Sequence, residues 1–121
     1  MLLIMDEIVT AFSLDLPGSF MTEQWGGSHV FKVGTSKTFK MFGILLPGED
    51  RLTLKTPSPD TRALLIEAEV ASMNVHLPRG SWVQLHLDRL DADDICERIS
   101  VSYGLVRATL PKRILVDLKE P

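Results

Sequence analysis

The chain of 121 residues is 45% hydrophobic and 24% charged, which is typical of one globular domain that buries a single core. Its formal net charge of -3 excludes a protein that is basic overall, as many nucleic-acid-binding domains are, but leaves a local basic face open. Its single cysteine, Cys96, excludes an internal disulfide and favours a reducing compartment, so we expect a cytoplasmic protein.

The chain starts with five apolar residues, but Asp6 and Glu7 follow and no basic residue precedes them. This pattern fits neither a signal peptide nor a membrane span. Apolar residues then recur at a spacing of three to four, at Ile8, Val9, Phe12 and Leu16. The spacing predicts a short helix that ends before Pro17.

The middle of the chain predicts strands. Residues 30–33, 37–46 and 51–56 are rich in β-formers, and the turn-forming segments 34–36 and 47–50 separate them. These runs predict a three-stranded antiparallel meander. Ser58 can then cap a second helix whose first residue is Pro59 and which runs to about residue 71.

The last third of the chain predicts a hairpin and a helix. Residues 73–77 and 82–87 flank the turn-rich segment 78–81, which is typical of a second hairpin. Asp91 can cap the final helix, and Pro111 ends it. The apolar stripe of this helix consists of Ile95, Ile99, Tyr103 and Val106. The predicted order is α-β3-α-β2-α, a two-layer α+β fold with an antiparallel sheet, in one domain over residues 1–121.

Short motifs follow one another along nearly the whole chain. They are Leu16-Pro17-Gly18, Trp25-Gly26, Phe31-Lys32-Val33-Gly34, Lys37-Thr38-Phe39, Leu52-Thr53-Leu54-Lys55, His76-Leu77, Trp82, Leu87-Asp88, Ser102-Tyr103 and Leu110-Pro111. In their order and spacing the chain resembles the MmcQ/YjbR family, small bacterial proteins often labelled as predicted DNA-binding. The resemblance implies an α-β3-α-β2-α fold similar to type III secretion chaperones.

The family's DNA-binding label derives from a proposed double wing, meaning two β-hairpins that straddle a duplex. In this chain the first wing tip, residues 47–50, carries Glu49 and Asp50 and would repel phosphate. The second tip carries Arg79 and is basic.

Strand alternation predicts a candidate nucleic-acid-binding face. Val83, Leu85 and Leu87 share one side of their strand, so the intervening residues would be presented on the other. The candidate residues are Lys37, Lys40, Lys55, Arg79, Trp82, Gln84 and His86. Together they would give a basic sheet face with an aromatic ring for base stacking. The alternative is that Trp82 lies in a minor core and that the lysines are simply solvated.

Catalytic and metal patterns are absent from the sequence. If Leu77 paired with Trp82, His76 and His86 would point to opposite faces and could not share one ion, and no familiar ligand set completes a site. Cys96 lies at an acidic helix start, where a thiol is inert. We therefore expect no enzyme, no cofactor and no metal.

Three functions remain open at this point. The first is a non-enzymatic module that binds DNA or RNA. The second is a protein-interaction or chaperone-like module, either with a partner protein or as a homodimer, that uses the open sheet face or an edge strand. The third, a small-molecule binder or enzyme, would require a closed apolar pocket with converging polar groups.

Overall fold

A six-stranded antiparallel sheet forms the centre of the computed structural model, which describes residues 2–118 and the side chains of residues 4–118. The strand order across the sheet is β1-β2-β3-β4-β6-β5. The strands are β1 (Ser19–Gln24), β2 (Ser28–Gly34), β3 (Phe39–Leu46), β4 (Arg51–Lys55), β5 (Ala71–Ser72) and β6 (Trp82–His86). The strands β1 to β4 are neighbours in sequence order, so short turns connect them.

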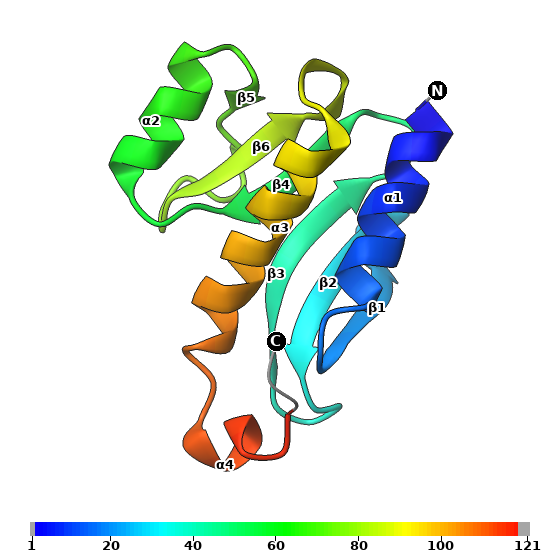
Figure 1. Ribbon diagram of the computed structural model, residues 1–121, viewed down its shortest axis with the longest axis vertical. Helices are drawn as coiled ribbons and strands as arrows, with labels where there is room; N and C mark the ends of the chain where they lie inside the picture. The colour runs from blue at the N-terminus through cyan, green and yellow to red at the C-terminus, as the bar shows by residue number, and fades with distance from the viewer. Residues whose placement is uncertain (1, 119–121) are drawn as a thin grey trace.

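Helices cover one face of this sheet. The helices are α1 (Leu2–Leu14), α2 (Pro59–Glu67), α3 (Ala92–Arg107) and α4 (Lys112–Leu115), with a short 3-10 turn η1 (Leu87–Arg89). Helices α1 and α3 lie side by side in front of the sheet, and α2 stands beside β5 at its edge (Figure 1). The predicted two-layer α+β architecture is confirmed, and none of the helices described in residues 2–118 covers the opposite sheet face.

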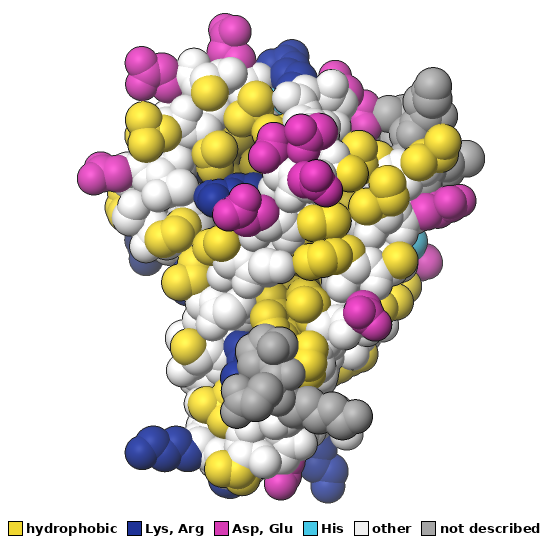
Figure 2. Space-filling model, viewed as in Figure 1, with side chains coloured by type: hydrophobic (Ala, Val, Ile, Leu, Met, Phe, Trp, Pro, Cys, Tyr) yellow, Lys and Arg dark blue, Asp and Glu magenta, His cyan; other side chains and the backbone are white. Residues whose placement is uncertain are grey.

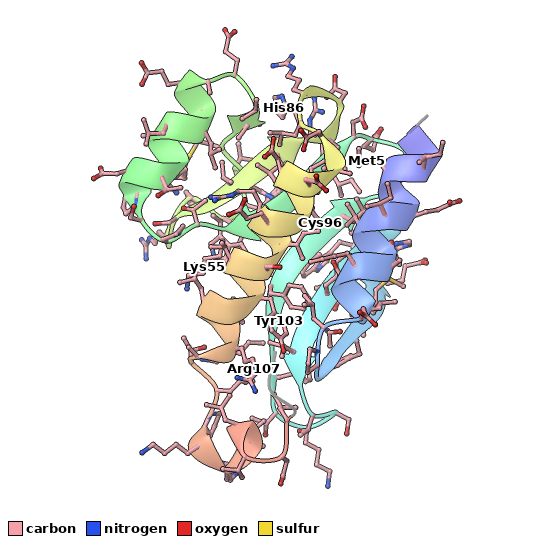
Figure 3. The ribbon with its side chains drawn as sticks, in the orientation of Figure 1. Met5, Lys55, His86, Cys96, Tyr103 and Arg107 are labelled. Carbon is pink, nitrogen blue, oxygen red and sulfur yellow. The ribbon has the colours of Figure 1, made fainter. Side chains whose placement is uncertain are left out.

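The core lies between the sheet and the pair α1 and α3. The cap and the apolar stripe of α3 are as predicted, although the helix ends at Arg107: Asp91 accepts a hydrogen bond from the Asp94 amide at 2.8 Å, and Ile95, Ile99, Tyr103 and Val106 are buried. The Tyr103 ring meets Phe42 of β3 edge-on at 5.5 Å between centroids, and its hydroxyl donates to the Pro17 carbonyl (Figure 3). The tyrosine thus links α3 both to the sheet and to the segment that connects α1 to β1.

A buried serine supplements this packing. Ser102 is fully buried on α3, and its Oγ donates to the Phe42 carbonyl of β3 at 2.6 Å. The same Oγ accepts a hydrogen bond from the Lys55 amide of β4 at 2.9 Å. One side chain therefore bonds to two neighbouring strands at the point where their own pairing ends, since the last β3–β4 pair is Gly43 with Leu54.

One predicted element was wrong in extent, and two elements of the structure were not predicted. Residues 19–24 form β1, a strand that was not predicted because its sequence, Ser-Phe-Met-Thr-Glu-Gln, is mostly polar and pairs only with β2. The second helix ends at Glu67 instead of about residue 71, because Glu69 takes a positive φ of 63° that ends a helix. Residues 112–115 form α4, which was also not predicted.

The second predicted hairpin was wrong in register. The strand β5 consists of residues 71–72 and pairs Ala71 with Leu85, whereas the predicted strand 73–77 is a turn. Asn74 is the cause: its side chain accepts a hydrogen bond from the His76 amide at 2.9 Å, and its carbonyl accepts one from the Leu77 amide at 3.0 Å. Such local bonds from asparagine compete with strand pairing.

A β-bulge interrupts the pairing of β2 with β3 between Phe31 and Lys32. Two consecutive β3 residues, Phe42 and Gly43, therefore face the helices. Phe42 is in the core, and a Cβ atom on Gly43 would meet the core side chains of Phe31 and Leu54. An extra residue of this kind reverses the side-chain alternation of the strand beyond it.

Candidate functional site

The open face of the sheet, which is turned away from the viewer in Figure 1, carries a groove of about 780 Å³. Its floor consists of strand residues: Ser28 of β2, Met41, Ile44 and Leu46 of β3, and Gln84 of β6. Residues 73–77 form one wall, and Trp25, at the tip of the β1–β2 hairpin, forms the other. Among the side chains that the structure describes, no lysine, arginine, aspartate or glutamate lines the groove itself.

The wall formed by residues 73–77 is fixed to the sheet. Asn74 donates through Nδ2 to the hydroxyl of Thr53 on β4 at 3.0 Å. Its Oδ1 atom accepts the His76 amide, so both ends of the Asn74 carboxamide are used within the chain. The exposed side chains of Met73 and Val75 project from this wall, and Val75 is 80% exposed.

Trp25 is unusual in both exposure and conformation. Its side chain is 65% exposed, and its backbone φ of 47° lies in the left-handed region, which is uncommon outside glycine. A large apolar side chain that is exposed on a strained backbone contributes little to stability in the free chain. Such strain is concentrated at binding and active sites.

The polar groups of the groove differ in whether they already form hydrogen bonds within the chain. Gln84 lies on the floor, half-buried, and its carboxamide makes no hydrogen bond with the part of the chain that the structure describes. It therefore offers one donor pair and one acceptor to a bound molecule. Ser28 is buried, and its hydroxyl donates to the Trp25 carbonyl at 3.4 Å.

Charged residues on the open face of the strands are all basic. Strand register places Lys32, Arg51 and Lys55 on this face, beside Met41, Leu46 and Trp82 respectively. Acidic side chains gather instead on the helix face, where Figure 2 shows them over the start of α3. The charged strand residues of the open face are thus basic, whereas the helix face carries a cluster of acidic side chains at the start of α3.

The seven predicted nucleic-acid-binding residues do not form one patch. The register places Lys55, Trp82, Gln84 and His86 together on the open face of β4 and β6, as predicted. Lys40 is on the helix side, opposite the core residue Val33, and its Nζ atom lies 3.4 Å from the Thr109 carbonyl. Placing Lys40 on the open face was therefore wrong, because the bulge reverses the alternation of β3.

The two other cations are in loops. Lys37 is in the turn between β2 and β3, and Arg79 is in the loop that precedes β6. The Trp82 side chain is neither fully exposed on the open face nor fully buried: it is half-buried and packs against the core. Of the seven residues, only Gln84 lines the groove.

The two predicted wing tips lie at opposite ends of β4. The first, residues 47–50, connects Leu46 to Arg51. The second, residues 78–81, lies beside the other end of β4, where the Thr56 amide donates to the Ser81 carbonyl at 3.0 Å. The first tip is also fastened to α1, because the buried Asp6 carboxylate accepts the Gly48 amide at 2.8 Å.

The three histidines lie apart on three elements. His76 is in the turn that walls the groove, and Trp82 pairs with Lys55, so the pairing of Leu77 with Trp82 that was considered for His76 does not occur. His29 is in β2, with Nε2 4.0 Å from the Glu23 carboxylate, and His86 is in β6. Within residues 2–118 no three histidine, cysteine, aspartate or glutamate side chains are placed to hold a metal ion.

The thiol of Cys96 on α3 (Figure 3) is not activated. Burial raises the pKa of Cys96, and the neighbouring Asp93 carboxylate raises it further, so the thiol form is favoured. Burial likewise raises the pKa of the Tyr103 hydroxyl. None of the helices described in residues 2–118 combines the length and the apolar character that crossing a membrane requires.

His86 titrates below its ordinary value. Burial lowers its pKa, and the positive charges of Arg51 and Arg89 lower it further, against an opposing effect of Asp88. Its Nε2 atom lies 3.0 Å from the Ser72 hydroxyl, while Nδ1 is buried without a partner in the described chain.

His86→Gln is expected to make the protein less sensitive to mild acid. As the pH falls below the ordinary value of 6.5, the unfolded chain takes up a proton at His86 that the folded chain resists. Stability is therefore lost from that pH downward until the folded pKa is reached, and the variant should lose less. Urea unfolding across this range measures the difference, with His76→Gln as the control. Parallel curves for the unaltered chain and His86→Gln would contradict the assignment.

Comparisons with known proteins identify a family and a similar solved structure. The family model described as YjbR matches residues 14–105. The crystal structure of a Deinococcus radiodurans protein with a DUF419 family domain is similar at a TM-score of 0.80. That chain is 27% identical, and the alignment covers 90% of this chain and 83% of the other. No curated protein matches the sequence.

Proposed function

The chain belongs to the YjbR family, and from this premise we propose that it is a non-enzymatic binding module that holds an apolar segment of a protein partner in the groove. The module acts in the cytoplasm, as its lone cysteine favours.

The observation that carries this proposal is the lining of the groove. Most of its side chains are apolar, namely Trp25, Met41, Ile44, Leu46, Met73, Val75 and Leu77. Trp25, Met73 and Val75 are also exposed to solvent, and contiguous exposed apolar surface is typical of interaction sites. Methionine side chains such as Met41 and Met73 adapt readily to different apolar partners.

The absence of charge in the groove distinguishes the classes of partner. Affinity for nucleic acid comes largely from lysine and arginine contacts to phosphate, and the groove lining offers none. A polypeptide segment needs apolar contact and a few hydrogen bonds, which the free Gln84 carboxamide supplies. A protein segment therefore fits the groove better than a nucleic-acid strand does.

A photo-crosslinking amino acid at Val75 tests this proposal in cells that produce the protein. Val75 is 80% exposed and lines the groove, whereas Val116 is 78% exposed and does not line it, so the same amino acid at Val116 is a matched control. We expect a discrete protein adduct from Val75 only. A product near twice 13.5 kDa would identify a second copy of this chain as the partner.

Two outcomes would overturn the proposal. The first is that the adducts from Val75 and Val116 are the same, which would show that other proteins contact the surface without a specific site at the groove. The second is an adduct from Val75 that nuclease treatment removes, which would show a nucleic-acid ligand.

A second candidate function, nucleic-acid binding, is favoured by the uniform sign of charge on the open face. Lys32, Arg51 and Lys55 are its charged strand residues, and Trp82 lies beside Lys55. Three phosphate contacts predict that log K falls with log salt with a slope of about -2 for a single strand. Fluorescence anisotropy of a labelled oligonucleotide at several salt concentrations tests this, and no binding at low salt would rule it out.

A further inference from the structure

We infer that the segment held in the groove carries carboxylate side chains, which lie at the Met41 end of the groove between Lys32 and Lys55. This inference rests on the proposed function and names the chemistry of the partner. It follows from where the groove ends, which charges flank each end, and how those charges are held.

Strand register places the two lysines on either side of the Met41 end. Lys32 of β2 lies directly opposite Met41 of β3. On the other side, Gly43 of β3 pairs with Leu54 of β4, so Lys55 is one residue beyond that pair, toward the same end. With neighbouring strands about 4.8 Å apart, the two backbones are separated by about 10 Å across β3. A segment lying along β3 would pass between the two ammonium groups.

The Lys32 ammonium is held in position without being neutralised. Its Nζ atom donates to the Gln24 carboxamide at 2.7 Å and lies 4.7 Å from the centre of the Phe39 ring. Phe39 is itself fixed by an edge-on contact with Phe20 at 5.5 Å. Neither partner carries a negative charge, so Lys32 keeps its full charge for a ligand.

The Lys55 ammonium is available as well. Among the described residues its Nζ atom has no hydrogen bond and no ion pair, and the side chain is half-buried beside Trp82. A cation in partly buried surroundings is screened less by solvent than one at a fully exposed site. The two lysines therefore form a basic gate, and no carboxylate of the described strand residues lies on the same strand face.

The opposite end of the groove has a different charge. There Leu46 lies next to Arg51, but the adjoining turn carries Glu49 and Asp50, and Arg51 also lies 4.0 Å from the Asp88 carboxylate. Positive charge at that end is offset by carboxylates of the chain itself. Complementary charge thus assigns the acidic part of the segment to the Met41 end.

Binding of two pools of synthetic peptides to the full chain tests this inference. Both pools have about ten residues, enough to cover a strand such as β3, and randomised apolar positions drawn from Leu, Ile, Val, Met and Phe. One pool carries Glu at its terminal positions and the other carries Gln. Anisotropy of labelled peptides should show tighter binding of the acidic pool, on the order of tenfold at low salt, and a smaller preference as salt is added.

Substitutions distinguish the effect of the two gate lysines from the effect of the overall charge of the protein. The double variant Lys32→Gln with Lys55→Gln should bind both pools equally and retain the affinity for the neutral pool. Lys37→Gln with Lys40→Gln is the matched control, because it also removes two positive charges, one from the exposed turn between β2 and β3 and one from the helix side of β3, both outside the groove. It should leave the preference for the acidic pool unchanged.

The outcomes distinguish the inference from the proposed function. If neither pool binds, the proposed function fails. If both pools bind with equal affinity, or if the double variant keeps the acidic preference, the groove binds apolar segments but the assignment of carboxylates to the lysine gate is overturned.

Discussion

Ser102→Ala is expected to lower the free energy of unfolding by about 2–4 kcal/mol, because it leaves two buried backbone groups without their partner. The Ser102 hydroxyl is the link between the Phe42 carbonyl and the Lys55 amide, at 2.6 and 2.9 Å. The side chain is fully buried, so water does not replace the lost bonds in the folded state. Urea or thermal unfolding of the variant measures the loss.

Ser100→Ala is the matched control for this prediction, since Ser100 is exposed on the same helix and has the same side chain. Its effect should stay within about 0.5 kcal/mol, as for most surface substitutions. An equal effect of the two substitutions would mean that helix propensity, and not the bridge between β3 and β4, governs the result. A Ser102→Ala protein as stable as the unaltered chain would show that the strands do not need the bridge.

Trp25→Asn is expected to reduce the affinity for apolar peptides at least thirtyfold, about 2 kcal/mol, as truncation of a tryptophan anchor at an interface does. The same substitution should leave folding stability unchanged or slightly raised. The Trp25 side chain is 65% exposed and its φ of 47° suits asparagine better than tryptophan. Binding and stability thus respond in different ways, which a purely structural role for Trp25 would not produce.

Leu64→Ala provides the comparison for Trp25, because Leu64 is an apolar residue with the same exposure, 65%, on α2 and outside the groove. Peptide affinity should be unaffected by this change. Anisotropy titrations and urea unfolding of both variants give the two readouts. A Trp25→Asn protein that binds peptides with unchanged affinity would remove Trp25 from the binding surface.

The elements with strong local signals were predictable from sequence. The Asp91 cap and the spacing of Ile95, Ile99 and Tyr103 defined α3, and the alternation of Val83 and Leu85 gave the correct faces of β6. In both cases the residues of the element itself supply the hydrophobic periodicity and the residues that mark its ends. The two-layer architecture followed from these elements, and the placement of the helices on one face confirmed it.

The reversal in β3 was not predictable from local pattern. Alternation counted back from Ile44 places Phe42 and Lys40 on the open face, whereas the bulge places both on the helix side and turns Met41 outward. The cause lies in a neighbouring strand, where the pairing with Phe31 and Lys32 shifts by one residue. The predicted basic patch on the open face was therefore wrong in including Lys40, although its residue types suit phosphate binding.

The groove was missed for a similar reason. Its walls come from a hairpin tip, for which no element was predicted, and from residues 73–77, which were predicted to be a strand. Two sequence signals could have found them. Trp25 precedes two glycines, a place where a large side chain has little chance of burial, and Asn74 lies where an asparagine turn competes with a strand. The spatial meeting of Trp25 with residues 73–77 required coordinates.

The hydrogen bond from Asn74 to Thr53 has a thermodynamic consequence for association. A loop that is already ordered loses little configurational entropy when it is docked, so more of the contact free energy remains as affinity. The substitution Asn74→Ala would remove this hydrogen bond and leave residues 73–77 disordered in the free protein. Ordering these residues on binding would then cost free energy and lower the affinity. In the free protein this side of the groove is therefore already ordered, whereas a flexible receptor becomes ordered only when its partner binds.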